Sequence, residues 1–369
     1  MNRLAVVPVV FPSARYDVFV GPHALEKAGS LLAPLASGRR VAVITDSVVG
    51  PLYADALIQS LEGSGFLVDT FAVEAGEPSK CWDRAGEILE WLARCGLDRT
   101  DTVVALGGGV VGDLGGFCAA VYLRGVAFVQ VPTTLLAQVD SSIGGKTGVD
   151  LVAGKNLAGA FIQPLCVIAD TAALATVPHS EWQSGLGEVV KSAVLDSEEF
   201  LSWLESHAGE LLARTPTAAD ETVRRCIAFK AGVVGADERE AGVRESLNLG
   251  HTLGHAIERE AGYGVVPHGI AVAEGMRFAL HLATALGHAD PRFRDRVLRL
   301  LDLLGLVRLT DIGTPDALRL AMSSDKKARA GVVRFVVPRA PGEHVVEAID
   351  PAVLVNQLDV YVRQGRGTS

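Results

Sequence analysis

The chain has 369 residues, of which 49% are hydrophobic and 21% are charged, and its formal net charge is -9. This length exceeds what one hydrophobic core usually serves, so we expect two domains, and the apolar fraction is too high for a disordered chain. The negative charge disfavours nucleic-acid binding, which requires a basic surface.

The N-terminal segment does not have the pattern of a signal peptide. Its apolar run is short and is interrupted by Pro8 and Pro12, and no stretch reaches the roughly 18 uninterrupted apolar residues of a transmembrane helix. The five cysteines are scattered and form no CxxC pair, which argues against a disulfide framework and against a thiolate metal site. We therefore expect a cytoplasmic protein without membrane contacts.

The first half of the chain predicts parallel strands joined by helices. Short β-branched apolar runs alternate there with amphipathic segments such as residues 51–62 and 82–95. These runs cover residues 40–44, 102–106, 128–131 and 166–169.

From about Pro178 helical periodicity dominates, and a late apolar run at 331–338 predicts a hairpin with residues 344–346. The helical segments are residues 180–195, 219–235, 248–261, 270–286 and 290–304. We predict an α/β fold in which a Rossmann-like domain (residues 1–178) is followed by a mostly α-helical domain (residues 179–369).

A glycine-rich turn follows one of the predicted strands. Gly107, Gly109 and Gly112 satisfy the pattern GxGxxG, in which glycines let the backbone approach a pyrophosphate at a helix N-terminus. The pattern alone is a weak indication, and a tight strand-to-helix turn without a ligand explains it equally well. Asp46, after another predicted strand, could bind a ribose hydroxyl or could cap the next helix.

Three of the nine histidines fall within 18 residues. His251 and His255 are four residues apart, so on a helix they share one face and could bind a metal together. Thr252 stands where the zinc protease motif HExxH has its glutamate, so peptide hydrolysis is not expected. His268 precedes another predicted helix. Glu188 lies in an apolar helical stretch, where a buried carboxylate needs a metal, a lysine or an arginine as its partner.

A glycine-rich and charged segment covers residues 140–156. It contains the letters GKT of a P-loop, but Asp140 occupies the position of the first P-loop glycine, so a nucleoside triphosphate site is not expected. We interpret the segment as a loop in which Lys146, Lys155, Asn156 and Asp140 could hold an anionic polyol.

Several longer motifs are more specific than these short patterns. They are GGGVVGDLGGF, YLRG, VPTTLLAQVDSSIGGKTGVD, GKN, GLGEVVK and NLGHTLGHAIE. Together they make the chain similar to the 3-dehydroquinate synthase family, over roughly Val41 to Pro338. The resemblance implies an N-terminal NAD-binding domain and conversion of 3-deoxy-D-arabino-heptulosonate 7-phosphate to 3-dehydroquinate and phosphate, in the shikimate pathway. It also implies two cofactors, NAD and a divalent metal (zinc or cobalt), for alcohol oxidation, phosphate elimination, ketone reduction and aldol ring closure.

The resemblance further implies roles for individual residues. The metal ligands would be Glu188, His251 and His268, and His255 would remain in the site as a proton-transferring or hydrogen-bonding group. The substrate would contact Asp140, Lys146, Asn156, Lys191, Lys230, Arg244 and Asn248. Within this set, Lys146, Lys191, Lys230, Arg244 and Asn248 would also take part in catalysis, together with His255.

Further residues would complete the substrate and cofactor sites. Lys327, in the run Asp325-Lys326-Lys327, would add positive charge, and Arg124 would reach the phosphate site of a second subunit, so the resemblance implies a homodimer. Val48 departs from the asparagine that many relatives carry near the adenosine. NAD would contact Asp46, Glu77, Lys80, Gly108, Gly109, Asp113, Thr133, Thr134, Lys146 and Lys155.

Other reactions remain as alternatives. Valiolone-type and inosose synthases usually alter the residues that would hold a substrate carboxylate, whereas Lys230, Arg244 and His255 are all present here. Amino-dehydroquinate synthesis stays open. A metal-dependent polyol dehydrogenase would release NADH, but the cationic residues around Lys146 and Lys191 favour a substrate with phosphate and carboxylate groups. A binding protein without catalysis is disfavoured because the metal-ligating and proton-transferring residues are all present.

Overall fold

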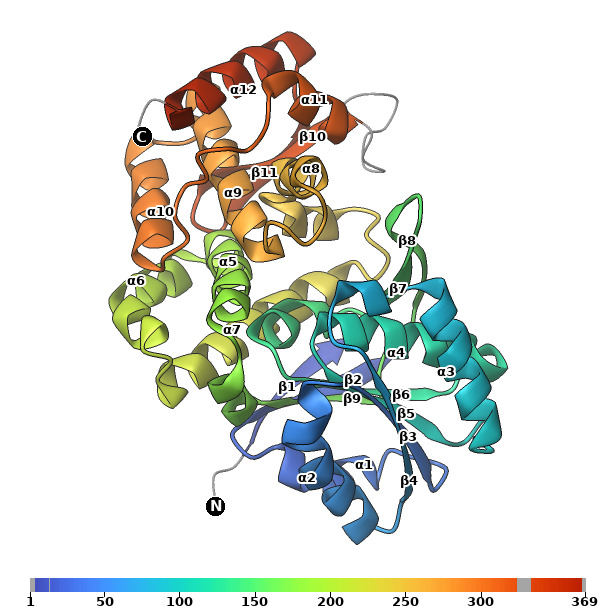
Figure 1. The fold of residues 1–369 in the computed structure, drawn as a ribbon. Coiled ribbons are helices and arrows are strands. Elements are labelled where there is room, and N and C mark those ends of the chain that lie inside the picture. Colours follow the sequence, from blue (N-terminus) through green and yellow to red (C-terminus); the bar gives the residue numbers. More distant parts are fainter. Residues whose placement is uncertain (1–3, 13, 324–332, 367–369) are drawn as a thin grey trace. The chain divides into compact units, whose positions relative to one another are not determined.

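The computed structural model describes residues 4–12, 14–323 and 333–366 (Figure 1). The chain forms two compact units: the first consists of Met1–Val177 and Ala219–Glu238, and the second of Pro178–Ala218 and Arg239–Ser369. Our sequence boundary at 178/179 differs from this division, since it assigns residues 219–238 to the second domain.

The first unit is built on a seven-stranded sheet with the order β1-β2-β9-β6-β5-β3-β4. Its strands are β1 (Ala5–Val10), β2 (Arg15–Gly21), β3 (Arg40–Asp46), β4 (Leu67–Val73), β5 (Thr102–Gly107), β6 (Ala127–Pro132) and β9 (Cys166–Asp170). Only the pair β1 and β2 is antiparallel among the pairings of this sheet. The predicted α/β fold with a Rossmann-like parallel sheet is confirmed, and the four predicted apolar runs form β3, β5, β6 and β9.

Helices cover both faces of this sheet (Figure 1). Alternate residues of β3 point to opposite layers: Ala42 and Ile44 pack with α3 and α4, whereas Val41 and Val43 pack with α1 and α2. Strands buried on both faces need apolar residues at nearly every position, which explains the uninterrupted β-branched runs. Besides a helix and a turn described below, the helices and short turns of this unit are η1 (Leu25–Lys27), α1 (Ala28–Leu32), α2 (Val49–Gly63), η2 (Glu77–Ser79), α3 (Trp82–Arg94), α4 (Gly109–Val121), η3 (Tyr122–Arg124) and η5 (Thr171–Thr176).

Helix α7 (Pro216–Ala236) returns the chain to the first unit. A Cβ atom on Gly235 would lie 2.5 Å from the carbonyl oxygen of Val10, so the helix backbone touches the β1 strand. Beyond the helix, Gln163 Nε2 donates a hydrogen bond to Glu238 Oε1 at 3.0 Å. These contacts are the physical reason for the difference from the sequence boundary, because helical periodicity does not reveal which partner a helix packs against.

The segment that we interpret as a loop is a hairpin, so that interpretation is wrong. A π-helical turn, η4 (Ala137–Ser141), precedes strands β7 (Lys146–Leu151) and β8 (Gly154–Phe161), which pair antiparallel. A Cβ atom on Gly159 would lie 2.4 Å from the Thr147 carbonyl oxygen, so glycine permits the close pairing of the strands. Glycine is rare inside strands, and its abundance here favoured a loop.

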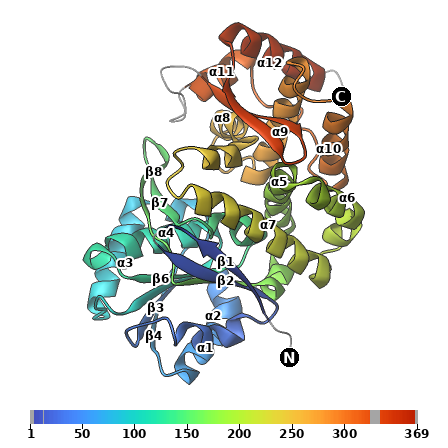
Figure 2. The same ribbon diagram turned by 180° about the vertical axis from the view of Figure 1, so that it is seen from behind.

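The second unit is mostly helical and contains one small hairpin. Its elements are α5 (His179–Asp196), α6 (Glu198–Leu212), η6 (Val243–Asn248), α8 (His251–Ala261), α9 (His268–Ala285), α10 (Pro291–Leu303), α11 (Pro315–Ser323), β10 (Arg334–Ala340), β11 (Glu343–Ala348) and α12 (Pro351–Arg366). Strands β10 and β11 pair antiparallel, as predicted for the late apolar run, whose first two residues lie outside the described residues. Figure 2 shows this hairpin beside α9, where the rings of Phe278 and Phe335 are 5.7 Å apart.

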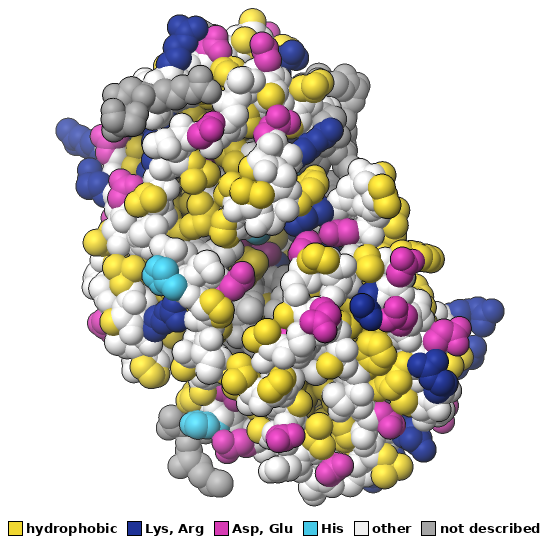
Figure 3. All heavy atoms as spheres, in the orientation of Figure 1, with side chains coloured by type: hydrophobic (Ala, Val, Ile, Leu, Met, Phe, Trp, Pro, Cys, Tyr) yellow, Lys and Arg dark blue, Asp and Glu magenta, His cyan; other side chains and the backbone are white. Residues whose placement is uncertain are grey.

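The described helices and the surface were compared with what a membrane or a nucleic acid requires of its partner. None of the described helices is both long enough and apolar enough to cross a membrane. On the face in Figure 3, basic and acidic side chains are interspersed with apolar ones, and the coloured, described residues of that face form no continuous basic band of the kind a phosphate backbone requires.

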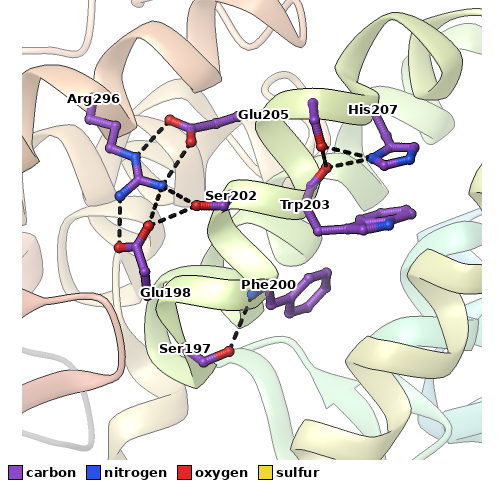
Figure 4. Close-up of polar contacts among 9 residues, drawn as sticks. Ser197, Glu198, Phe200, Ser202, Trp203, Glu205, His207 and Arg296 are labelled. Atoms are coloured by element: carbon purple, nitrogen blue, oxygen red, sulfur yellow. Dashed lines mark hydrogen bonds and ion pairs between the residues drawn. The ribbon is translucent and has the colours of Figure 1, made fainter.

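Arg296 joins α10 to α6 through a cluster of polar contacts (Figure 4). Its guanidinium donates to both carboxylate oxygens of Glu205 at 2.8 Å, to Glu198 at 2.7 Å and to the Ser202 hydroxyl at 2.8 Å. The hydrogen bonds from Arg296 and then from Ser202 lower the pKa of the Glu198 carboxyl. The cluster therefore ties two helices together as long as its carboxylates are ionised.

We expect Arg296→Ala to lower the free energy of unfolding by roughly 1 kcal/mol, because partly exposed ion pairs are weakened by solvent. A carboxyl whose pKa is lowered by folding stabilises the folded protein at any pH above its ordinary pKa, which is 4.5 for Glu198. This stabilisation is lost as the pH falls below that value towards the lowered pKa. The difference between Arg296→Ala and the unmodified protein should therefore shrink in acid. Denaturant unfolding over a pH series measures it, with the exposed Arg299→Ala as control; a difference that is constant with pH contradicts the role of Glu198.

Candidate functional site

Helices α5 and α9 touch through their backbones next to two candidate metal ligands. A Cβ atom on Gly187 would lie 2.2 Å from the carbonyl oxygen of Gly269, closer than real Cβ contacts allow. Glu188 follows Gly187, and His268 precedes Gly269. Any larger side chain at these glycines would push the helices apart and separate the carboxylate from the imidazole.

A second pair of glycines brings α8 against α9. A Cβ atom on Gly275 would lie 1.8 Å from the carbonyl oxygen of Gly250. Gly250 also has φ of 80°, a left-handed conformation that suits glycine, and it separates η6 from α8. The helix expected over residues 248–261 therefore begins only at His251, and His268, expected in a loop, is the first residue of α9.

Glu188, His251 and His268 form one cluster in the second unit. Glu188 Oε1 lies 3.6 Å from His251 Nε2 and 3.5 Å from His268 Nε2, and the Glu188 side chain is fully buried. Lys191, one turn further along α5 and equally buried, forms an ion pair with the other carboxylate oxygen, Oε2. One ligand atom from each of the three residues lies within 4.8 Å of the others, so a single ion could contact all three.

The histidine pair suggested by spacing alone does not form a shared group. Two groups of possible ligands occur among the described residues, and they divide His251 from His255: Glu188, His251 and His268 make one, and His255, Glu258 and His268 make the other. The ring centroid of His255 lies 5.4 Å from that of His251 and 6.0 Å from that of His268. His255 is therefore a neighbour of the first group rather than a member.

Hydrogen bonds orient both imidazoles of the cluster. The Nδ1 atom of His251 lies 3.1 Å from the carbonyl oxygen of Leu249, and Nδ1 of His268 lies 3.2 Å from Glu258 Oε2. Burial alone would lower the pKa of His268, but the hydrogen bonds with Glu188 and Glu258 outweigh it and raise the pKa to about 10. The two carboxylates thus make this site attractive to positive charge.

The remaining candidates of the second unit lie on η6. The Arg244 side chain is 2% exposed, and Asn248 Nδ2 donates to Glu240 Oε1 at 3.1 Å. An ion pair between Arg334 on β10 and Glu245, at 3.0 Å, ties η6 to the hairpin. The short helix that carries Arg244 and Asn248 is therefore held at its centre.

The first unit carries a separate set of substrate candidates. Lys230 on α7 is 7% exposed, and its Nζ donates to the carboxylate and the backbone carbonyl of Asp140, at 2.8 and 2.6 Å. Lys146 opens β7 with an exposed side chain. Asn156 lies on the neighbouring strand β8 with φ of 54°, and its backbone N–H donates to Asp150 Oδ1 at 2.8 Å.

The candidate nucleotide residues meet at the carboxyl ends of neighbouring strands. From β3 the chain continues to β4 on one side, whereas β5, β6 and β9 lie on the other side, so the order reverses between β3 and β5. Ligands of doubly wound sheets bind outside the carboxyl ends of strands at such a reversal. Asp46 ends β3, Gly108 and Gly109 follow β5, and Thr133 and Thr134 follow β6.

The structure shows where the glycine-rich turn ends and what its glycines contact. Helix α4 begins at Gly109, so most of the turn belongs to the first helical turn. A Cβ atom on Gly108 would lie 3.1 Å from Thr134 Cγ2, and one on Gly112 would lie 2.7 Å from the Gln130 side chain. A larger residue at Gly112 would displace the end of the Gln130 side chain, and one at Gly108 would press on the Thr134 side chain.

Asp46 caps a helix, the alternative that its sequence position left open. Its Oδ1 accepts hydrogen bonds from the backbone N–H groups of Val48 and Val49 at 2.9 and 2.8 Å, at the start of α2. The side chain of Val48, the departure from the family pattern, is exposed. A cofactor contact by Asp46 stays a prediction.

Charged candidates for the nucleotide form ion pairs in the first unit. Lys80 Nζ lies 2.5 Å from Asp113 Oδ2, and Lys155 Nζ lies 3.0 Å from Glu77 Oε1. Burial lowers the pKa of Lys80, but the Asp113 carboxylate outweighs this effect and the pKa is raised overall. Lys80 therefore keeps its charge in the folded protein.

Arg124 and Lys327 are the remaining candidates. Arg124 is exposed and has φ of 70°, between Leu123 with 49° and Gly125 with 115°. Lys327, with the rest of the run 325–327, lies outside the described residues.

Comparison with known proteins identifies the family. Residues 70–184 match the model of the 3-dehydroquinate synthase N-terminal domain, and residues 185–328 match that of the C-terminal domain. The chain is 47% identical to the 3-dehydroquinate synthase of Pseudomonas entomophila over 332 residues, which covers 90% of each chain. The chain belongs to the 3-dehydroquinate synthase family.

Solved structures of similar enzymes share the fold of this family member. The chain is similar to 2-epi-5-epi-valiolone synthase from Streptomyces hygroscopicus, solved with NAD+ and Zn2+, with 29% identity, a TM-score of 0.87 and coverage of 96% of this chain and 97% of that one. It is also similar to 2-deoxy-scyllo-inosose synthase, solved with carbaglucose-6-phosphate, NAD+ and Co2+, with 25% identity, a TM-score of 0.88 and coverage of 96% and 100%.

Sequence reasoning missed one residue of the histidine cluster in this family member. Glu258 is 5% exposed and contacts His268. It lies seven residues after His251 and three after His255, so all three side chains share one face of α8. That spacing is the signal that could have found it.

Proposed function

We propose that this chain is a 3-dehydroquinate synthase, which converts 3-deoxy-D-arabino-heptulosonate 7-phosphate to 3-dehydroquinate and phosphate. The observation that carries the proposal is the cluster of Glu188, His251 and His268 in a chain of this family. Identity is 47% to a 3-dehydroquinate synthase, against 29% and 25% to the valiolone and inosose synthases, which favours the carboxylated substrate.

The residues present fit both cofactors. One carboxylate oxygen and two imidazole nitrogens are a donor set that suits zinc or cobalt and leaves a coordination position open. The reversal of strand order between β3 and β5, with the glycine turn after β5 at the N-terminus of α4, suits a dinucleotide. When bound, the metal would polarise the reacting oxygens and NAD would take up and return a hydride.

The chain's own residues supply positive charge and proton transfer. Lys191 balances the buried carboxylate of Glu188. Lys230 is fixed by two contacts with Asp140, which suits an ammonium that must meet an anionic substrate at a defined position. The His255 imidazole, next to the ligand imidazoles, would give or take a proton beside the reacting centre.

The other assignments in the proposal follow the family motifs. Substrate contacts are assigned to Lys146, Asn156, Arg244, Asn248 and, from a second subunit, Arg124. Contacts with NAD are assigned to Asp46, Glu77, Lys80, Gly108, Gly109, Asp113, Thr133, Thr134, Lys146 and Lys155.

We expect phosphate release from the heptulosonate phosphate with only catalytic amounts of NAD and without accumulation of NADH, because the hydride returns within each turnover. A phosphate assay and absorbance of NADH follow the reaction, and mass spectrometry identifies the product. Steady accumulation of NADH would instead indicate a polyol dehydrogenase. Turnover of an amino-substituted substrate in preference to the heptulosonate would indicate amino-dehydroquinate synthesis.

The proposal includes a cytoplasmic homodimer. Arg124 is exposed, as a contact with a second copy requires. Analytical ultracentrifugation tests the dimer. Mixing Arg124→Ala with a variant inactive at His255 tests the shared site, since a mixed dimer would contain one complete site and regain activity.

A further inference from the structure

The two imidazoles that face Glu188 are held in the same way. In His251 and in His268 the Nε2 atom points to Glu188 Oε1, and the Nδ1 atom contacts an oxygen acceptor. For His251 this acceptor is the backbone carbonyl oxygen of Leu249, which would be present with any residue at position 249. For His268 it is the carboxylate of Glu258, which depends on one residue.

We propose that Glu258 is a positioning residue that orients His268 as a metal ligand and selects the tautomer that binds. This inference rests on the metal site of the proposed function and adds a residue to it that acts through His268.

The chemistry follows from the acceptor. A carboxylate can only accept a hydrogen bond, so Nδ1 of His268 must carry the proton and donate it to Glu258 Oε2 over 3.2 Å. In the neutral ring the lone pair then lies on Nε2, the atom directed at Glu188. A carboxylate behind a ligating imidazole also makes the imidazole a better electron donor.

The packing gives Glu258 the rigidity that this role needs. The side chain is buried on the face of α8 that also carries His251 and His255. The neighbouring glutamate Glu260, two residues further on, is exposed and provides a matched control on the same helix.

A second interpretation of the same residues makes a different prediction. His255, Glu258 and His268 also form a group whose ligand atoms lie within 4.8 Å of one another. If Glu258 were itself a ligand there, it would bind a separate ion. The geometry favours the positioning role, because Glu258 faces Nδ1 of the ring whose Nε2 faces Glu188.

The experiment measures Zn2+ and Co2+ affinity by competition with a chromophoric chelator, together with the visible spectrum of the Co2+ form. We expect Glu258→Ala to weaken metal binding by about 10 to 100-fold. Glu258→Gln should weaken it less, because its amide oxygen still accepts from Nδ1. Both should shift the Co2+ bands, and Glu260→Ala should change neither quantity.

Several outcomes would overturn the inference. Unchanged affinity and spectrum in Glu258→Gln and Glu258→Ala would show that His268 needs no carboxylate; if the alanine variant does not fold, the isosteric glutamine variant decides alone. Two ions per chain, one of them lost in Glu258→Ala, would make Glu258 a ligand. If the unmodified protein binds no metal and His251→Ala changes nothing, the metal site of the proposed function fails as well.

Discussion

His268→Ala is expected to abolish metal binding, whereas His255→Ala is expected to keep the metal and lose most of the turnover. The reason is geometric: His268 Nε2 lies 3.5 Å from Glu188 Oε1, while His255 belongs to a different group of ligand atoms. Loss of a residue that transfers protons typically slows catalysis by about 10² to 10⁴-fold. Equilibrium dialysis with metal analysis measures the first effect, and phosphate release measures the second.

His288→Ala is the control, because this histidine of the second unit pairs with Glu347 and lies outside both groups. Treatment with a chelator should stop phosphate release by the unmodified protein, and added zinc or cobalt should restore it. Equal metal loss in His268→Ala and His255→Ala would contradict the division between ligand and proton-transferring residue. Activity that survives complete metal removal would contradict the whole ligand assignment.

The parallel sheet could be predicted from the sequence because strands buried on both faces leave a simple pattern. Val41 to Ile44 form such a run, and each residue packs against a helix layer. The β7 and β8 hairpin could not be predicted in this way, because Gly148 and Gly159 lie in its strands and glycine is more typical of loops than of strands. The return of α7 to the first unit depends on contacts such as that between Gly235 and Val10, which periodicity does not encode.

The candidate site, like the fold, could be predicted only in part from the sequence. The spacing of His251 and His255 is visible in the sequence, but the structure places the two histidines in different groups of possible ligands. A shared helical face does not determine where each ring nitrogen points. Glu188 lies on a different helix and meets the histidines only because glycines let α5 and α9 touch. The family motifs supplied that carboxylate. Glu258 also lies in one of these motifs, as the last residue of NLGHTLGHAIE, but its role follows from its contact with His268.

Lys191→Met is expected to lower the free energy of unfolding of the metal-free protein by about 3 to 5 kcal/mol, the usual cost of removing one partner of a buried ion pair. Lys191 and Glu188 are 2% and 0% exposed, so without its lysine the carboxylate would stay buried with only the imidazoles of His251 and His268 beside it. Denaturant unfolding in the presence of a chelator measures the loss. Saturating zinc should reduce it, because a bound divalent ion supplies positive charge to the same carboxylate.

The double variant Lys191→Met with Glu188→Gln provides the matched control. It removes both charges and keeps the side chains similar in size, so the metal-free protein should regain much of the stability lost in Lys191→Met. The double variant should gain little from zinc, since it lacks the carboxylate ligand. If the double variant is as unstable as Lys191→Met, packing of the lysine stem rather than charge explains the loss. If zinc stabilises Lys191→Met no more than the double variant, the ion does not bind at Glu188.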